Sequence, residues 1–185
     1  DVRGNYSYKT YDTLGRLAYE VDQESYVTGY TYNAFGEQAT LRRYATPLGA
    51  IGGWTAGTAI TLPQLTASVV ISSATLDRLL STSYDGLGRQ TQVQQSAVTY
   101  IKADGSSATG TPTTQFTYSS YGEVVKTSVL LDAASSVWAN TYQYYDDLGR
   151  NTVTVDAEGY VTVQVYNALG EVTQNTEYAR ALSAT

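Results

Sequence analysis

The chain has 185 residues, a formal net charge of −6, and no Cys, His or Met. The absence of Cys and His excludes a Ser-His-Asp triad, a Cys nucleophile and His/Cys zinc sites. The acidic balance argues against nucleic-acid binding and against a basic membrane-surface helix, since both need basic faces. No apolar run is long enough to span a bilayer, so the sequence predicts no membrane insertion by this segment.

Tyrosine dominates the aromatic residues, with 18 Tyr against 2 Phe and 2 Trp. Tyr and Thr favour strands because aromatic and branched side chains suit a pleated, half-buried surface. A buried phenol needs a hydrogen-bond partner, so this much Tyr favours a large, partly wet sheet over an oily core. The composition therefore predicts an all-β fold.

A hexad recurs along the chain. It consists of an aromatic residue, then Asp or Asn (once Ser), two variable positions ending in an apolar or aromatic residue, Gly and a charge. The first two copies start 32 − 11 = 21 residues apart, as do the last two, and the two ends of the chain are copies at a constant offset of 145 − 11 = 134. The hexads span residues 11–16, 32–37, 84–89, 118–123, 145–150 and 166–171.

Each hexad has the features of a hairpin turn. Asp or Asn in the second position bonds the backbone two residues on, and the Gly takes a positive φ, as in a type I turn closed by a bulge. We expect the apolar residue before the Gly to tuck under the turn. The predicted structural residues are Tyr11, Asp12, Gly15, Arg16, Tyr32, Asn33, Gly36, Glu37, Tyr84, Asp85, Gly88, Arg89, Tyr118, Gly122, Glu123, Tyr145, Asp146, Gly149, Arg150, Tyr166, Asn167, Gly170 and Glu171.

The residues around the hexads alternate with period two, as in Tyr30-Thr31-Tyr32, which indicates strands. A second turn lies within the repeat, at 22–25 in the first copy and at 156–159 in the last. Each repeat is thus predicted as strand, turn, strand, turn. The whole chain, 1–185, is predicted as one antiparallel β-hairpin array, with all hexad turns along one edge.

Two stretches interrupt the pattern. Residues 45–64 contain several Gly and Pro and are predicted as an inserted loop. The small and polar stretch 102–114 is also predicted as an insertion, either a surface loop or the tip of a long hairpin. Residues 65–80 could hold a short helix, although their Thr, Ser and Val content weakens that assignment. The part from Arg78 to Tyr84 is predicted as a strand leading into the third hexad.

The last position of the hexad alternates strictly between Arg and Glu. If the hexad turns stack as neighbours, each Arg lies next to the Glu of the adjacent hexad, and such pairs would set register more than stability. This predicts cross-strand Arg–Glu pairs among Arg16, Glu37, Arg89, Glu123, Arg150 and Glu171.

Two groups of acidic residues could have a chemical function, but a role in forming turns explains both of them better. Asp146 and Asp147 could form a carboxylate pair for acid–base work, but Asp146 occupies the turn position and adjacent strand residues point to opposite faces. Asp156 and Glu158, or Asp22 and Glu24, could hold Ca²⁺ as loop oxygens, but their spacing is shorter than that of an EF-hand loop. We therefore predict no catalytic, cofactor-binding or metal-binding residues, no cofactor and no enzyme activity.

The aromatic residues leave an alternative open. A ladder of Tyr could bind sugars by stacking, yet Tyr at the hexad recurs with the structural period, so packing in a wall is the simpler cause. Trp54 and Trp138 fall outside the hexads and are the better candidates for a ligand or partner contact.

The six hexads, with their Tyr-Asp-x-Leu-Gly-Arg core, resemble the YD repeats of RHS proteins, which include bacterial polymorphic toxins, the B and C components of Tc toxins, and animal teneurins. The resemblance covers roughly residues 8–178. It implies a segment of a spiralling hollow β-shell that, in the bacterial members, encloses a C-terminal toxin domain. Those shells close with a core segment bearing an Asp-Pro motif, and the sequence contains no Asp-Pro, so self-cleavage is assigned to no residue here.

This resemblance implies a structural, non-catalytic shell segment that encloses and protects a toxin or effector domain. Its partners would be the remainder of the parent protein and the enclosed domain, and its location secreted or at the cell surface. The alternative is an extracellular adhesion or carbohydrate-binding module that uses exposed tyrosines and the inserted loops, with a cell-surface glycan as partner.

Overall fold

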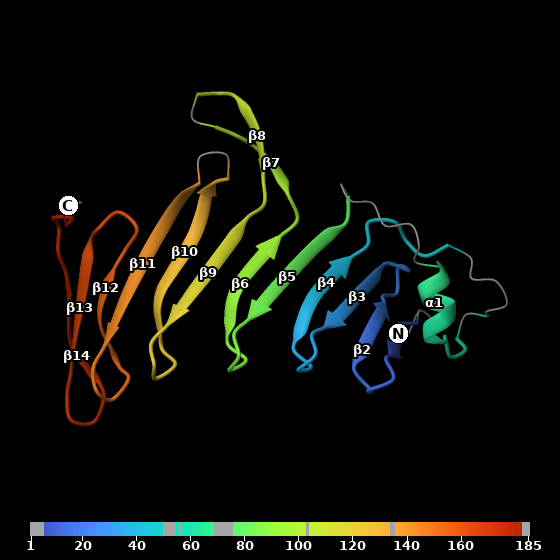
Figure 1. The fold of residues 1–185 in the computed structure, drawn as a ribbon, viewed down its shortest axis with the longest axis horizontal. Coiled ribbons are helices and arrows are strands. Elements are labelled where there is room, and N and C mark those ends of the chain that lie inside the picture. The colour runs from blue at the N-terminus through green and yellow to red at the C-terminus, as the bar shows by residue number, and fades with distance from the viewer. Residues whose placement is uncertain are drawn as a thin grey trace. The chain divides into compact units, whose positions relative to one another are not determined.

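The computed structural model describes residues 6–49, 55, 57–68, 76–102, 104–133 and 136–182. The chain forms two compact units, unit 1 from residues 1–83 with 94–97, and unit 2 from residues 84–93 with 98–185. Both consist almost entirely of antiparallel strands joined by short turns (Figure 1). The prediction of an all-β fold of hairpins is confirmed. No helix in the described ranges is long and apolar enough to cross a membrane.

Nearly every strand pairs with its neighbours in the sequence, so backbone hydrogen bonds are satisfied locally. Twelve described strands follow the order β1-β2-β3-β4-β5-β6-β9-β10-β11-β12-β13-β14, and β7 pairs with β8. The elements are β1 (Tyr8–Tyr11), β2 (Leu17–Val21), β3 (Val27–Tyr32), β4 (Gln38–Arg43), α1 (Leu62–Ser68), β5 (Arg78–Tyr84), β6 (Gln90–Gln95), β7 (Val98–Ile101), β8 (Ser107–Gly110), β9 (Thr113–Tyr118), β10 (Val124–Asp132), β11 (Val137–Tyr145), β12 (Asn151–Val155), β13 (Val161–Tyr166) and β14 (Val172–Glu177).

Each hexad sits at the end of a hairpin. In unit 2 the β9–β10, β11–β12 and β13–β14 turns lie on one edge (Figure 1), because every second turn of a meander returns to the same side. The register shifts by one residue just before Tyr145 in the β11–β12 pair and before Tyr166 in the β13–β14 pair. These shifts are the predicted bulges. Pairs in unit 1 shift in the same way before Tyr11 and Tyr32.

The turns within the repeat have the same geometry as the hexad turns. In the last copy the Asp156 N–H donates to the Tyr160 carbonyl (3.0 Å) and Gly159 has a φ of 88°. In the first copy Asp22 N–H donates to the Tyr26 carbonyl (2.9 Å), but Ser25 occupies the left-handed position with a φ of 70°. A side chain at this φ crowds the following backbone, so Ser25 is strained.

Ser25→Gly is expected to stabilise unit 1. The left-handed conformation costs a residue with a side chain roughly 1–2 kcal/mol, and the extra flexibility of Gly removes about 0.5–1 kcal/mol of that gain. The free energy of unfolding, measured in urea, should rise by about 0.5–1 kcal/mol. The reverse change in the other copy, Gly159→Ser, should destabilise, because its Cβ would lie 3.2 Å from the Leu182 carbonyl oxygen. A loss of stability in Ser25→Gly would show that the turn is not strained.

Residues 57–68 build the core of unit 1. Leu65 is fully buried and Ile60 nearly so, and both pack against Val21 and Val27, which are each 2% exposed. The helix α1 lies beside β2, as Figure 1 shows. Residues 57–68 therefore cover one face of the sheet in unit 1. The sequence instead predicts a loop over 45–64 and a short helix within 65–80.

The helix begins at Leu62, earlier than the predicted range of 65–80. The reason is a capping box at Thr61 and Gln64: the Gln64 side-chain oxygen accepts hydrogen bonds from the Thr61 N–H (3.0 Å) and hydroxyl (2.7 Å). Pro63 is tolerated because the first turn of a helix needs no N–H donor there. Trp54 and residues 69–75 lie outside the described residues.

A buried Asp77 links the chain just before β5 to the end of β4 and the residues that follow it. Its carboxylate accepts a hydrogen bond from the Ala45 N–H (3.0 Å) and lies 3.5 Å from the Arg42 guanidinium. Asp77 is 4% exposed, and a carboxylate so buried needs such partners. The chain therefore returns to the sheet next to the point where it left after β4. The strand β5 starts there, at Arg78, as predicted.

The range 102–114, predicted as a surface loop or a long hairpin tip, contains the second strand of a hairpin, β8, and the start of β9. β7 and β8 form a hairpin in which Tyr100 lies opposite Ala108. The Tyr100 hydroxyl donates to the Asp132 carboxylate (2.6 Å), which fixes the hairpin to the end of β10 and raises the pKa of Tyr100 above 10.0.

Candidate functional site

The hexad turns are closed by the residue in their second position. In hexad 145–150 the Asp146 carboxylate accepts hydrogen bonds from the N–H groups of Leu148 and Arg150, both at 3.0 Å. The Gly149 N–H donates to the Asp146 carbonyl (2.9 Å), and Gly149 has a φ of 74°. The other five hexads repeat this pattern, with Asn or Ser in place of Asp in three of them. The predicted turn is therefore present in all six hexads, each with its Gly at a positive φ.

The predicted Arg–Glu pairs between hexads are wrong. Each charged residue in the last position instead bonds the second residue of its own hexad. Three hexads join Arg to Asp at 2.7 Å, and we call these the Arg hexads: Arg16–Asp12, Arg89–Asp85 and Arg150–Asp146. The other three, the Glu hexads, join Glu to a neutral donor: Asn33 to Glu37 (2.5 Å), Ser119 to Glu123 and Asn167 to Glu171 (2.7 Å). The turn places the second and the sixth residue of a hexad within hydrogen-bonding distance of each other, so they bond within the turn and not to a neighbouring hairpin.

Contacts between hairpins run from each Arg hexad to the following Glu hexad. The Arg150 guanidinium lies over the Tyr166 ring, 4.8 Å from its centre, and donates to the Asn167 carbonyl (3.2 Å). In return, the Tyr166 hydroxyl donates to the carbonyl of Asn151, the residue after Arg150 (2.7 Å). Tyr166 thus has its ring under a cation and its hydroxyl on a backbone carbonyl.

The same contacts recur in the other two pairs of hexads. Arg16 lies over Tyr32 and Arg89 over Tyr118, both at 4.5 Å, while the Tyr32 and Tyr118 hydroxyls donate to the carbonyls of Leu17 (2.9 Å) and Gln90 (2.7 Å). The contact between Glu hexad 118–123 and the following Arg hexad 145–150 is different. There the Tyr145 hydroxyl donates to the Val124 carbonyl (2.9 Å), but no Arg of the described residues lies over the Tyr145 ring. The sheet is therefore built from pairs of unlike hexads.

The apolar residues before the Gly do not tuck under the turns, contrary to the prediction. They point outward with exposed fractions between 74% and 90%. The turn is closed by backbone hydrogen bonds and by the Asp, Asn or Ser side chain, so it needs no apolar contact beneath it. One large exposed side chain stands at each turn: Leu14, Phe35, Leu87, Tyr121, Leu148 and Leu169.

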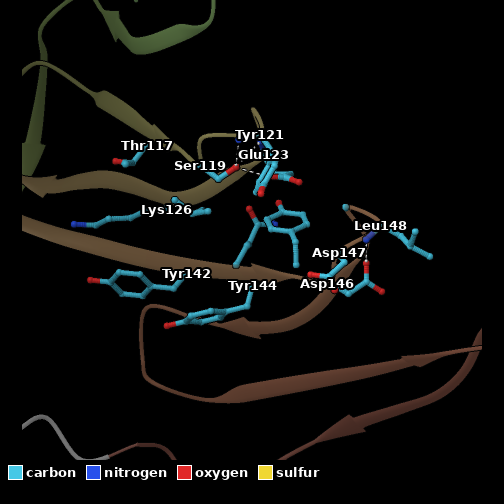
Figure 2. Close-up of a pocket in the computed structure, with 14 residues that line it drawn as sticks. Thr117, Ser119, Tyr121, Glu123, Lys126, Tyr142, Tyr144, Asp146, Asp147 and Leu148 are labelled. Carbon is cyan, nitrogen blue, oxygen red and sulfur yellow. Dashed lines mark hydrogen bonds between the residues drawn. The ribbon is translucent and has the colours of Figure 1, made fainter.

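A groove of about 920 Å³ lies in unit 2 between hexads 118–123 and 145–150. We call it the tyrosine groove. Figure 2 shows Tyr142 and Tyr144 side by side on β11, with Tyr121 at the neighbouring turn. Tyr121 and Tyr144 are exposed, and the Lys126 ammonium lies 5.6 Å from the centre of the Tyr142 ring. Aromatic faces with polar groups at their rim are suited to stacking a flat, hydroxylated ligand.

Asp146 and Asp147 both line this groove, but they do not form an acid–base pair. Hydrogen bonds from the Arg150 side chain and backbone hold the pKa of Asp146 below 3.8. A carboxylate in this environment stays ionised near neutral pH and is a poor proton donor. Asp156 is likewise engaged in its turn, accepting from the N–H groups of Glu158 (2.9 Å) and Tyr160 (2.8 Å). Trp138 lies half-buried in β11 opposite Leu130.

The Asp residues of the three Arg hexads should make the stability fall steeply in acid. Hydrogen bonds from the backbone of Arg16 and Arg89 lower the pKa of Asp12 and Asp85 below 3.8, as the Arg150 side chain does for Asp146. The unfolded chain binds these protons more readily, so the stability they contribute is present above pH 3.8 and is lost as the pH falls through the lower folded-state values.

Asn in all three positions, the residue that Glu hexads 32–37 and 166–171 use, keeps the turn but cannot titrate. We expect the urea midpoint of Asp12→Asn/Asp85→Asn/Asp146→Asn to depend less steeply on pH than that of the wild type between about pH 4 and pH 2. Equal slopes would mean that these carboxylates do not carry the acid sensitivity.

No family model and no curated protein matches the sequence. Solved structures that align with the chain at low identity include the crystal structures of TcdB2–TccC3–Cdc42 (12% identity, TM-score 0.45, 94% of this chain), TcdB2–TccC3 (13%, 0.38, 86%) and TcdB2–TccC3–TEV (14%, 0.38, 90%). This chain spans 9%, 11% and 13% of the respective aligned chains.

Proposed function

We propose that the chain is a wall segment of an RHS-type shell, secreted or at the cell surface, that encloses and protects a C-terminal toxin or effector domain without catalysing a reaction. The pairing of Arg and Glu hexads carries this proposal. The Tyr hydroxyls, Arg guanidinia and Asp or Asn side chains of the paired hexads bond within their own turn or to the adjoining hairpin. Groups held in this way join strands into a continuous sheet.

A wall of this kind depends on the hydroxyl bonds between hairpins. Tyr166→Phe removes the hydroxyl that bonds the Asn151 carbonyl and should lower the free energy of unfolding by about 0.5–1.5 kcal/mol. Tyr160→Phe is the matched control, because Tyr160 is exposed and lies in a turn within the repeat. Equal effects of the two changes would show that the hexad hydroxyls do not join the hairpins.

The enclosing role is tested in the parent polypeptide by limited proteolysis. If the segment forms part of a shell, the effector domain should resist protease until the wall is opened. Arg89→Ala/Arg150→Ala, which removes two of the contacts between hairpins, should open it. An effector domain cleaved equally fast with and without an intact wall, or a parent polypeptide without such a domain, would contradict the proposal.

A second candidate is glycan binding, favoured by the tyrosine groove. Exposed Tyr121 and Tyr144 provide stacking faces, while Asp147 and Lys126 provide polar groups nearby. A glycan array is the direct test, with Tyr121→Ala/Tyr144→Ala as the variant that should lose any signal. Leu169→Ala, a change at an equally exposed turn outside the groove, serves as the control.

A further inference from the structure

The internal copy allows one face of the sheet to be compared in two settings. In the first copy, the directly paired residues Tyr8, Val21 and Val27 lie in one row across β1, β2 and β3. Ile60 and Leu65 cover this row, leaving both valines 2% exposed. The offset of 134 places Tyr142, Val155 and Val161 in the same row across β11, β12 and β13, and the structure pairs them in that register.

In unit 2 this row is open. Val155 and Val161 are partly exposed, and Tyr142 is 39% exposed. The next row on the same face contains Val153 opposite Val163. We call the surface formed by Tyr142, Val153, Val155, Val161 and Val163 the valine floor. It consists of apolar side chains on the face that carries a covering segment in unit 1.

The differences between the copies preserve the volume of this face. Val153 and Val163 replace Tyr19 and Gly29, where the missing side chain of Gly29 leaves room for the Tyr19 ring, 2.9 Å from a Cβ placed there. The large Tyr19 and the small Gly29 of the first copy thus correspond to two valines of medium size in the last copy. The valine floor therefore remains a flat apolar surface able to receive aliphatic side chains.

The border of the floor is also duplicated. In the first copy Tyr44 N–H donates to the Val27 carbonyl, and in the second Tyr178 N–H donates to the Val161 carbonyl, both at 2.9 Å. Leu48, which packs against the covered core, donates from its N–H to the Ser25 carbonyl (2.7 Å). Its equivalent Leu182 donates to the Gly159 carbonyl (2.9 Å).

We propose that the valine floor is a docking surface for a short segment of a partner polypeptide that, like residues 57–68, places one aliphatic side chain just before a helical turn and a second one within it, as Ile60 and Leu65 are placed. The same face in unit 1 already shows the chemistry of such an occupant. The floor offers methyl groups and few hydrogen-bonding groups, so it suits aliphatic side chains better than a saccharide. This inference is independent of the shell proposal.

The probe is a capped peptide with the sequence of residues 57–68, added to the full chain and followed by NMR of valine methyl groups. We expect saturable shifts at Val155 and Val161. Because so short a helix is marginal in water, the same sequence is also fused after Thr185 through a flexible linker, which raises its effective concentration to the order of millimolar. A peptide with Asp in place of both Ile60 and Leu65 should cause no shifts in either format.

Val161→Lys should weaken binding at least tenfold, whereas Thr162→Lys, one residue along on the opposite face, should leave it unchanged. Hydrogen exchange of β12 and β13 confirms that both variants are folded. Three results would overturn the proposal: no saturable shift with either format, shifts only at Val21 and Val27 in unit 1, or sedimentation showing that a second copy of the chain already covers the floor.

Discussion

Leu65→Ala is expected to lower the free energy of unfolding of unit 1 by about 2–5 kcal/mol. Leu65 is fully buried, and it belongs to the small core that residues 57–68 form with Val21 and Val27. The substitution removes buried methyl groups and leaves a cavity where few other apolar side chains are available. Hydrogen exchange of the β2 and β3 amides under native conditions would report the loss in this unit separately from the other.

Leu14→Ala provides the matched control for this experiment. Leu14 is the same residue type in the same unit, but it is 74% exposed at a turn. Its truncation should change stability by no more than about 0.5 kcal/mol. If both changes cost the same, the segment 57–68 would not form the core of unit 1.

Arg150→Glu is expected to have the second largest effect. The change removes the guanidinium over the Tyr166 ring and its hydrogen bond to the Asn167 carbonyl, and it places a carboxylate beside Asp146. Loss of the contacts with the ring and the carbonyl alone should lower the free energy of unfolding by about 2 kcal/mol, with allowance for their partial exposure. The urea midpoint of unit 2 would report the loss.

Asp146→Asn added to Arg150→Glu should restore part of this loss. The double variant has the Asn and Glu of hexad 166–171, in which Asn167 bonds Glu171 at 2.7 Å. The bond within the turn is thereby recovered, while the contact with Tyr166 stays lost. A double-mutant cycle measures the coupling between positions 146 and 150. A double variant no more stable than Arg150→Glu alone would show that the two positions do not act together.

The turns could be predicted because their signals are local. Asp, an apolar residue and Gly at fixed positions specify the hydrogen bonds that the structure contains. The same locality explains the two wrong predictions. The Arg/Glu alternation predicts Arg16 beside Glu37 of the adjacent hexad, yet the turn itself brings Asp12 to within 2.7 Å. The hexad pattern predicts Leu14 under the turn, but Leu14 is 74% exposed, because the hydrogen bonds of Asp12 close the turn without it.

The remainder of the fold depends on contacts that are distant in sequence. Nothing near Asp77 indicates that it will be buried against Ala45 and Arg42, because that contact forms only when the insertion closes on the sheet. The covering role of residues 57–68 is hidden for the same reason. The start of their helix did have a readable signal in Thr61 and Gln64, whereas β8 is too short and polar to stand out from a loop.

The pairing of unlike hexads imposes a rule of parity on how such a chain can evolve. Loss of a single hairpin would place two Arg hexads, or two Glu hexads, side by side, and an Arg such as Arg150 would then meet a neighbour with its own guanidinium in place of the Glu hexad. Duplication or deletion of two hairpins together preserves every contact. Length in this architecture should therefore change in steps of whole pairs.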